Sequence, residues 1–136
     1  MFRHHNPLIN IEHYNYYVKC VNRFKDLLQK QEHKLFIMIF LKFDNYNDNI
    51  KINNIKNKII DFNIKFSKYT SNYTLLIIIQ IPNKQENHHK FTYNDNIHFL
   101  ELHTLGLSNG VEFTNKNDNI YLDNIIKSKY NFNVNI

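Results

Sequence analysis

One short motif in the second half of the chain has the residue types and spacing of a catalytic site. Gly106, Ser108 and Gly110 fit the G-x-S-x-G pattern, in which a strand and a helix hold a nucleophilic serine on a sharp turn. A strand-like segment precedes the motif, but residues 111–118 have the character of extended chain and loop, and no histidine follows His103. We therefore interpret the motif as a tight turn that uses the chain's two glycines where φ must be positive.

Paired histidines at positions 4–5 and 88–89 raise the question of a metal site. Adjacent residues of a strand or helix point in different directions, so neither pair can chelate a metal by itself. A composite site of His5, His88 and an aspartate is an alternative, but no spacing here matches a zinc motif. We place the second pair in a solvated loop, and we predict neither a metal site nor a cofactor.

Cys20, Glu101 and His103 are the other side chains with catalytic potential. Cys20 falls in the middle of a predicted helix, whereas a reactive thiol needs a helix N-terminus or an adjacent histidine, so we interpret it as structural. The single cysteine also excludes an internal disulfide and a cysteine-rich zinc site. Glu101 and His103 alternate onto one strand face, where an acid–base pair is possible but a structural ion pair is favoured.

The spacing of apolar residues predicts the elements that position these groups. Three- and four-residue steps predict helices, and continuous apolar runs predict strands buried on both faces. The first half contains a helix over 11–31, a strand over 34–43, a helix from 52 to about 68, and a strand over 73–81 that ends at Pro82. A strand–helix–strand succession predicts parallel strands with a right-handed crossover.

The second half is predicted as a polar loop over 83–96, a strand over 97–105 and a last helix over 118–129. Asp118 or Asn119 is expected to cap that helix, and a short strand is possible near 111–113. The predicted fold class is α/β, with three αβα layers and a short, mostly parallel sheet in one domain over residues 1–136. Because the order α-β-α-β-β-α starts with a helix that follows no strand, we expect an incomplete larger domain.

Composition restricts the class of protein. The 136 residues carry a formal charge of +5, and the abundance of Ile, Asn and Lys is typical of an AT-rich genome, such as that of a large DNA virus or a protist. The lysines are spread along the chain, which favours a solvated surface over a nucleic-acid site. The start lacks a signal peptide, and the apolar runs at 35–41 and 75–79 are too short to span a membrane. We expect a cytoplasmic protein, in the host cytoplasm if it is viral.

Strand order suggests where a ligand would bind. In an open parallel sheet, ligands bind beyond the carboxyl ends of the strands. The polar side chains expected at those ends are Asp44, Asn83, Ser108, Asn109 and the backbone at Gly110. The last helix begins nearby at Asp118, and its free N–H groups suit an anion such as a nucleotide or sugar phosphate.

Several short segments, taken together, carry a family resemblance. They are Phe2-Arg3-His4-His5, Tyr16-Tyr17, residues 22–28, residues 110–113 and residues 118–122. This pattern resembles the C-terminal half of the papain-like cysteine peptidase family of uncharacterised bacterial and large-DNA-virus proteins. The resemblance implies that His5 (or His4) and Asp118 match the family's catalytic histidine and acidic residue. The family's nucleophilic cysteine lies in an upstream, glycine-containing segment that this chain does not have, and Cys20 does not match it.

Three functional hypotheses follow from these observations. The first is a truncated or degenerate peptidase-like domain without its own nucleophile, inactive alone, whose partner would be an upstream fragment. The second is a small binding module for an anionic ligand at the strand ends. The third is weak nucleic-acid binding through lysines, with an affinity that falls as salt rises. No membrane partner is expected.

Overall fold

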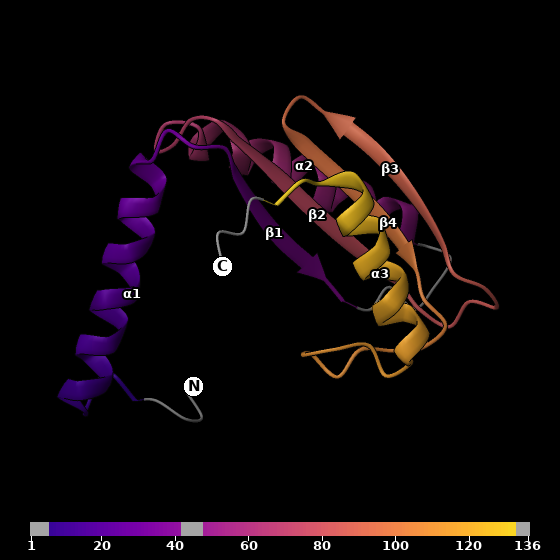
Figure 1. Cartoon of the computed structure of the whole chain (residues 1–136), viewed down its shortest axis with the longest axis horizontal. Helices are drawn as coiled ribbons and strands as arrows, with labels where there is room; N and C mark the ends of the chain where they lie inside the picture. The colour runs from indigo at the N-terminus through magenta and orange to yellow at the C-terminus, as the bar shows by residue number, and fades with distance from the viewer. Residues whose placement is uncertain (1–5, 42–47, 133–136) are drawn as a thin grey trace.

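A four-stranded sheet between two helices forms the body of the molecule, and a third helix projects from it (Figure 1). The computed structural model describes residues 6–41 and 48–132. The elements in chain order are α1 (Ile11–Gln29), β1 (Lys34–Phe40), α2 (Asp48–Phe66), β2 (Tyr73–Ile81), β3 (His88–Asn94), β4 (Ile97–His103) and α3 (Lys116–Lys129). The predicted α/β class with a mostly parallel sheet is confirmed. The observed order is α-β-α-β-β-β-α, with one strand more than predicted.

Strand β2 lies at the centre of the parallel part of the sheet. The strand order is β1-β2-β4-β3, and β2 pairs in parallel with both β1 and β4. Its first eight residues are buried, from Tyr73 to Gln80. A strand covered on both faces has no side that needs polar residues, which explains its continuous apolar run. Strands β1 and β2, which α2 connects along the chain, are parallel, and this confirms the predicted pairing.

The prediction of a polar loop over residues 83–96 is wrong, because this segment contains β3. Strand β3 pairs antiparallel with β4 from His88 opposite His103 to Asn94 opposite Ile97. A two-residue turn, Asp95-Asn96, joins the two strands, and Asp95 adopts a φ of +48°, which Asp tolerates better than most residues. Strand β3 is an edge strand with little apolar content, so it lacks the continuous hydrophobic run that marks β1 and β2.

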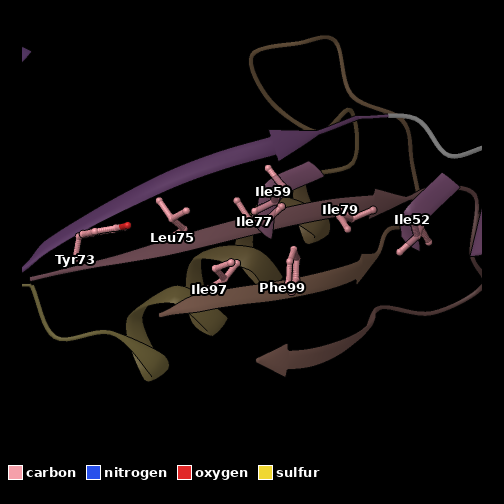
Figure 2. Close-up of a cluster of buried hydrophobic side chains, with 8 residues drawn as sticks. All are labelled: Ile52, Ile59, Tyr73, Leu75, Ile77, Ile79, Ile97 and Phe99. Carbon is pink, nitrogen blue, oxygen red and sulfur yellow. The ribbon is translucent and has the colours of Figure 1, made fainter. Parts of the chain in front are cut away.

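Two separate hydrophobic clusters hold the helices to the two faces of the sheet. On one face, Ile52 and Ile59 of α2 pack against the odd-numbered residues of β2 and against Ile97 and Phe99 of β4 (Figure 2). On the other face, Ile125 of α3 packs against Leu76, Ile78, Leu100, Leu102 and Phe113. The three predicted layers, helix, sheet and helix, are present. Because the alternate residues of each strand belong to different clusters, the strand register fixes both helices.

Helix α1 does not belong to either layer. None of its 19 residues, all of which the structure describes, is buried. It begins at Asn10, whose side chain accepts hydrogen bonds from the backbone N–H groups of Glu12 and His13. Its N-terminal end lies well apart from the strands (Figure 1). Across the described part of the chain, no helix has both the length and the apolar character to cross a membrane.

Replacement of Ile77 by alanine is expected to lower the free energy of unfolding by about 3 kcal/mol. Ile77 is fully buried in β2, so the shorter side chain loses apolar burial and leaves a cavity. Urea denaturation followed by circular dichroism measures the change. Ile64→Ala, at an exposed position of α2, is the matched control and should alter stability by less than about 0.5 kcal/mol. An equal effect of both substitutions would contradict the central position of β2.

Candidate functional site

The carboxyl edge of the sheet is closed by a turn that the structure holds to β4. After β2, Asn83 adopts a φ of +59° and reverses the chain. The backbone N–H of Lys84 then donates to the carbonyl of Thr104 (2.9 Å), and the N–H of Thr104 donates to the carbonyl of Ile81 (3.0 Å). These bonds hold the backbone of Lys84 close to the end of β4. Asn83 lies at the strand end where the sequence placed it.

Two histidines meet at this edge, on the face of the sheet that α2 covers. His88 begins β3 and lies directly opposite His103, the last residue of β4. Their rings are in edge-to-face contact, with centroids 5.5 Å apart. The prediction that residues 88–89 form a solvated loop is therefore wrong. His89 points to the opposite face, where its Nδ1 lies 2.6 Å from the hydroxyl of Tyr121, as the two-residue period of a strand requires.

Positive charge gathers around His103. Partial burial lowers the pKa of His103 below its usual value, and the charges of Lys84 and His88 lower it further. Glu101, two residues earlier on the same face, acts in the opposite direction. The carboxylate of Glu101 lies 3.7 Å from the ammonium of Lys56 on α2. The structural ion pair that the sequence favoured for Glu101 is present, but its partner is Lys56 rather than His103.

Helix α2 also begins at this edge of the sheet. Its direction opposes that of the parallel strands, so its N-terminus lies at their carboxyl ends. Ile52, near the start of α2, packs at the end of β2 beside Ile79 (Figure 2). The N-terminus of a helix carries the positive end of the macrodipole and favours anions. Lys84, His88 and His103 together form what we call the basic edge.

The opposite face of the same edge has the reverse charge. Asp118 is fully buried at the third position of α3. Its carboxylate accepts hydrogen bonds from the backbone N–H groups of Leu105 (2.9 Å) and Gly106 (3.0 Å) and from the amide of Asn87 (2.6 Å). The start of α3 is therefore occupied by the chain's own carboxylate. An external anion would be repelled there, so the expected binding to the free N–H groups of this helix does not fit the observed geometry.

The cap of α3 also differs from the prediction. Asn115, not Asp118 or Asn119, is the N-cap, and its side chain accepts from the N–H of Asn117 (2.9 Å). Asn119 instead exchanges two hydrogen bonds with the backbone of Phe113. Asp118 and Asn119, the two predicted caps, thus bind the loop that precedes the helix. The helix begins two residues earlier than expected because Asn115 provides the cap.

The G-x-S-x-G motif forms a closed loop and not a nucleophile elbow. The hydroxyl of Ser108 donates to the carbonyl of Glu112 (3.2 Å) and accepts from the N–H of Gly110 (3.0 Å). Asn109 accepts from the N–H groups of Val111 and Glu112, and Ser108 forms an isolated antiparallel bridge with Phe113. The bridge is what remains of the short strand proposed near 111–113. The interpretation of the motif as a tight turn is confirmed.

The two glycines of this loop have different roles. Gly110 adopts a φ of +94°, as predicted. Gly106 does not have a positive φ, so that part of the prediction is wrong. A side chain at Gly106 would place its Cβ 2.7 Å from the hydroxyl of Thr114, which is too close. The carbonyl of Gly106 also accepts from the buried amide of Gln80 (3.2 Å).

Several predicted site residues lie away from the basic edge or outside the described residues. His5 and Asp44 fall outside the described ranges, as does the His4–His5 pair. Cys20 lies midway along α1 beside Tyr16, whose pKa is raised mainly by a hydrogen bond with the Cys20 side chain. Within residues 6–41 and 48–132, no group of three or more His, Cys, Asp or Glu residues is arranged to hold a metal ion.

A shallow hollow of about 400 Å³ at the opposite, amino edge of the sheet is an alternative site. Its polar groups already bind one another. The hydroxyl of Tyr73 donates to Asn63 (2.6 Å), the amide of Asn63 donates to Asn96 (2.9 Å), and the amide of Asn96 donates to the carbonyl of Tyr73 (3.2 Å). This closed set joins the end of α2 to the turn between β3 and β4. We interpret the hollow as structural.

The pairing of His88 with His103 is the feature that the sequence interpretation missed. It depends on β3, a strand that the apolar pattern of the sequence does not predict. Two signals could have revealed it: the alternation of larger side chains in His89, Phe91 and Tyr93, and the Asp95-Asn96 pair that immediately precedes an apolar strand. With a hairpin in place, register alone sets His88 opposite His103.

Comparison with known proteins identified no relative of this chain. No family model matches the chain, and no curated protein and no solved structure matches it. The resemblance to the papain-like cysteine peptidase family remains a prediction based on short sequence segments.

Substitution of Asp118 is expected to destabilise the fold of the ligand-free protein. Asp118→Ala should lower the free energy of unfolding by about 3 kcal/mol, because it leaves two backbone N–H groups and one amide without their acceptor. Chemical denaturation measures the loss. Asp123→Ala removes an exposed carboxylate from the same helix, where it pairs with Lys127, and should cost less than about 1 kcal/mol. Equal, small effects of both substitutions would contradict the structural role of Asp118.

Proposed function

We propose that this domain binds a small, phosphate-bearing anion at the basic edge. The observation that supports the proposal is the convergence of Lys84, His88 and His103 at the carboxyl ends of β2 and β4, beside the start of α2. Ligands of open α/β sheets bind at this edge. The proposed ligand class is that of nucleotides and sugar phosphates. The binding groups differ from those expected earlier, since Ser108 and Asn109 are engaged within their own loop.

Each group of the basic edge has a distinct role in the proposed binding. Lys84 provides a permanent positive charge on a turn that is held to β4 by a backbone hydrogen bond. His88 is exposed and can approach a ligand directly, whereas His103, opposite it on β4, is partly buried. A charge-assisted hydrogen bond to a phosphate oxygen contributes about 1.5–3 kcal/mol. Two or three such bonds account for binding in the micromolar to millimolar range.

The proposal sets the direction of the pH dependence. Burial and the neighbouring charges of Lys84 and His88 lower the pKa of His103, so this imidazole is neutral at neutral pH. A bound anion stabilises the imidazolium and raises that pKa, so binding takes up a proton. The affinity therefore increases as the pH falls. Glu101 limits the increase, because its carboxylate already stabilises the charged form of His103.

A ligand screen by thermal denaturation tests the proposed function. Nucleotides and sugar phosphates at millimolar concentration are expected to raise the melting temperature of the wild-type chain, since a ligand of the folded state stabilises it. His103→Gln and Lys84→Gln should each weaken binding by about tenfold, equivalent to about 1.4 kcal/mol. Lys127→Gln, on the exposed face of α3, is the matched control and should bind as the wild type does.

The pH dependence is measured separately with inorganic sulfate, whose charge is constant over the range used. Binding of sulfate should tighten from about pH 8 to about pH 6 in the wild type, and this change should shrink in His103→Gln. The absence of a thermal shift with every anion tested would contradict the proposal. So would equal losses in Lys84→Gln and Lys127→Gln, because a general charge effect does not distinguish between these positions.

The peptidase-like hypothesis leads to a different expectation. If the chain is a degenerate member of that family without its nucleophile, a thiol-directed activity probe should leave Cys20 unlabelled at concentrations that label an active papain-like enzyme. Labelling of Cys20 that is lost in His5→Ala would overturn the expectation of inactivity, because it would show a thiolate activated by that histidine. Iodoacetamide labelling of the unfolded chain is the control for thiol content.

A further inference from the structure

Helix α1 presents an exposed apolar surface that a folded protein seldom leaves uncovered. Tyr14, Val18, Val21 and Phe24 follow one another at steps of three and four residues, and each exposes between 38% and 52% of its surface. Together they form what we call the α1 stripe. Isolated helices of this length owe most of their stability to packing of such a face. The helix also contains three Tyr, two Val and two Asn residues, which are mediocre helix formers.

The breadth of the α1 stripe indicates what kind of surface covers it. Successive residues of a helix are separated by about 100°, so the four members span an arc of roughly 120°. A two-stranded coiled coil needs only a narrow seam, whereas a helix that packs on a sheet presents a face of at least about 100°. The stripe therefore matches the face of a sheet better than it matches a second copy of α1.

An uncovered sheet face exists in the same molecule. Strand β1 is an edge strand, and its Phe36, Met38 and Phe40 pack toward α2. Its Ile37 and Ile39 point to the other face and remain 45% and 50% exposed, and Leu41 continues this surface. Helix α3 crosses β2 and β4 on that face, and no other helix among the described residues lies over β1 there (Figure 1). We call these three side chains the β1 face.

Contacts at the end of α1 hold the helix away from its own β1 face. The carbonyl of Leu28 accepts from the hydroxyl of Thr70 (2.7 Å), and the carbonyl of Gln31 accepts from the amide of Asn72 (2.8 Å). Phe24 meets Phe36 edge to face, on the side of the sheet that α2 covers. In this position α1 cannot also lie over Ile37 and Ile39, which point to the other side.

We infer that two copies of this chain exchange their α1 helices, so that the α1 stripe of each copy covers the β1 face of the other. The exchange supplies the missing helix next to α3 without breaking the contacts that anchor α1. The contact is self-complementary, as a two-fold dimer requires, because each chain contributes both surfaces. The kind of partner is thus a second copy of the same chain.

The area available agrees with a reciprocal contact. Half of the surface of a large apolar side chain is roughly 80 Å². Two copies of the stripe and of the face would therefore bury on the order of 1,000 Å² of apolar surface, and the polar rim brings the total into the range of about 1,200–2,000 Å² found for stable interfaces. A one-way contact would bury only half of this area, which is too little for a specific dimer.

Chemical cross-linking distinguishes the possible arrangements, because Cys20 of α1 is the chain's single cysteine. A wild-type chain is mixed with a mass-tagged Cys20→Ser, Ile39→Cys chain and treated with a short bismaleimide. The proposal predicts a covalent heterodimer. A chain that carries both Cys20 and Ile39→Cys should also cross-link between copies. The matched control replaces Ile39→Cys with Ile64→Cys, at an exposed position of α2 on the opposite face, and should give no heterodimer.

The oligomeric state provides the second readout. Light scattering coupled to size-exclusion chromatography should give twice the chain mass for the wild type and a monomer for Val21→Asp. Asn22→Asp adds the same charge at the neighbouring position of α1, outside the stripe, and should remain dimeric. A monomeric wild type would overturn the inference. So would a cross-link within one chain, which would mean that α1 covers its own β1 face, or cross-linking of wild-type chains through Cys20 alone.

Discussion

The parallel pairing of β2 with β1 and β4 is the constraint on which the rest of the structure depends. It places three carboxyl ends at one edge and buries β2 on both faces. The register then assigns alternate side chains to the α2 layer and to the α3 layer. A shift of one residue would exchange the two sets and expose both clusters. Every group discussed at the carboxyl edge has its position because this register is fixed.

The two faces of the carboxyl edge differ in charge because different elements end there. On the α3 face, the buried carboxylate of Asp118 satisfies the backbone of the loop after β4, which makes that side a structural joint. On the α2 face, the hairpin of β3 and β4 brings His88 to His103. A ligand cannot replace Asp118 without breaking the loop, whereas His88 is exposed and its ring only contacts that of His103 edge to face. Binding potential therefore concentrates on the α2 face.

The elements with a strong hydrophobic period were predictable, and those without one were not. Strand β2 has the bounds that its apolar run predicts, and α1 and α2 differ from prediction by a few residues at their ends. Strand β3 was missed because an edge strand covered on one side only needs few apolar residues. The role of Asp118 was also out of reach, since its three donors come from residues 87, 105 and 106, which only the tertiary fold brings together.

The sequence could show that α1 has an apolar face, but it could not show what that face contacts. The helical period of apolar residues indicates that one face of the helix packs against another surface, but it does not indicate whether that surface belongs to the same chain. Here two tertiary hydrogen bonds, from Thr70 to Leu28 and from Asn72 to Gln31, hold the end of α1 in a position where the helix does not lie over the β1 face of its own chain. A single copy thus leaves two apolar surfaces exposed, and the proposed dimer would cover both at once.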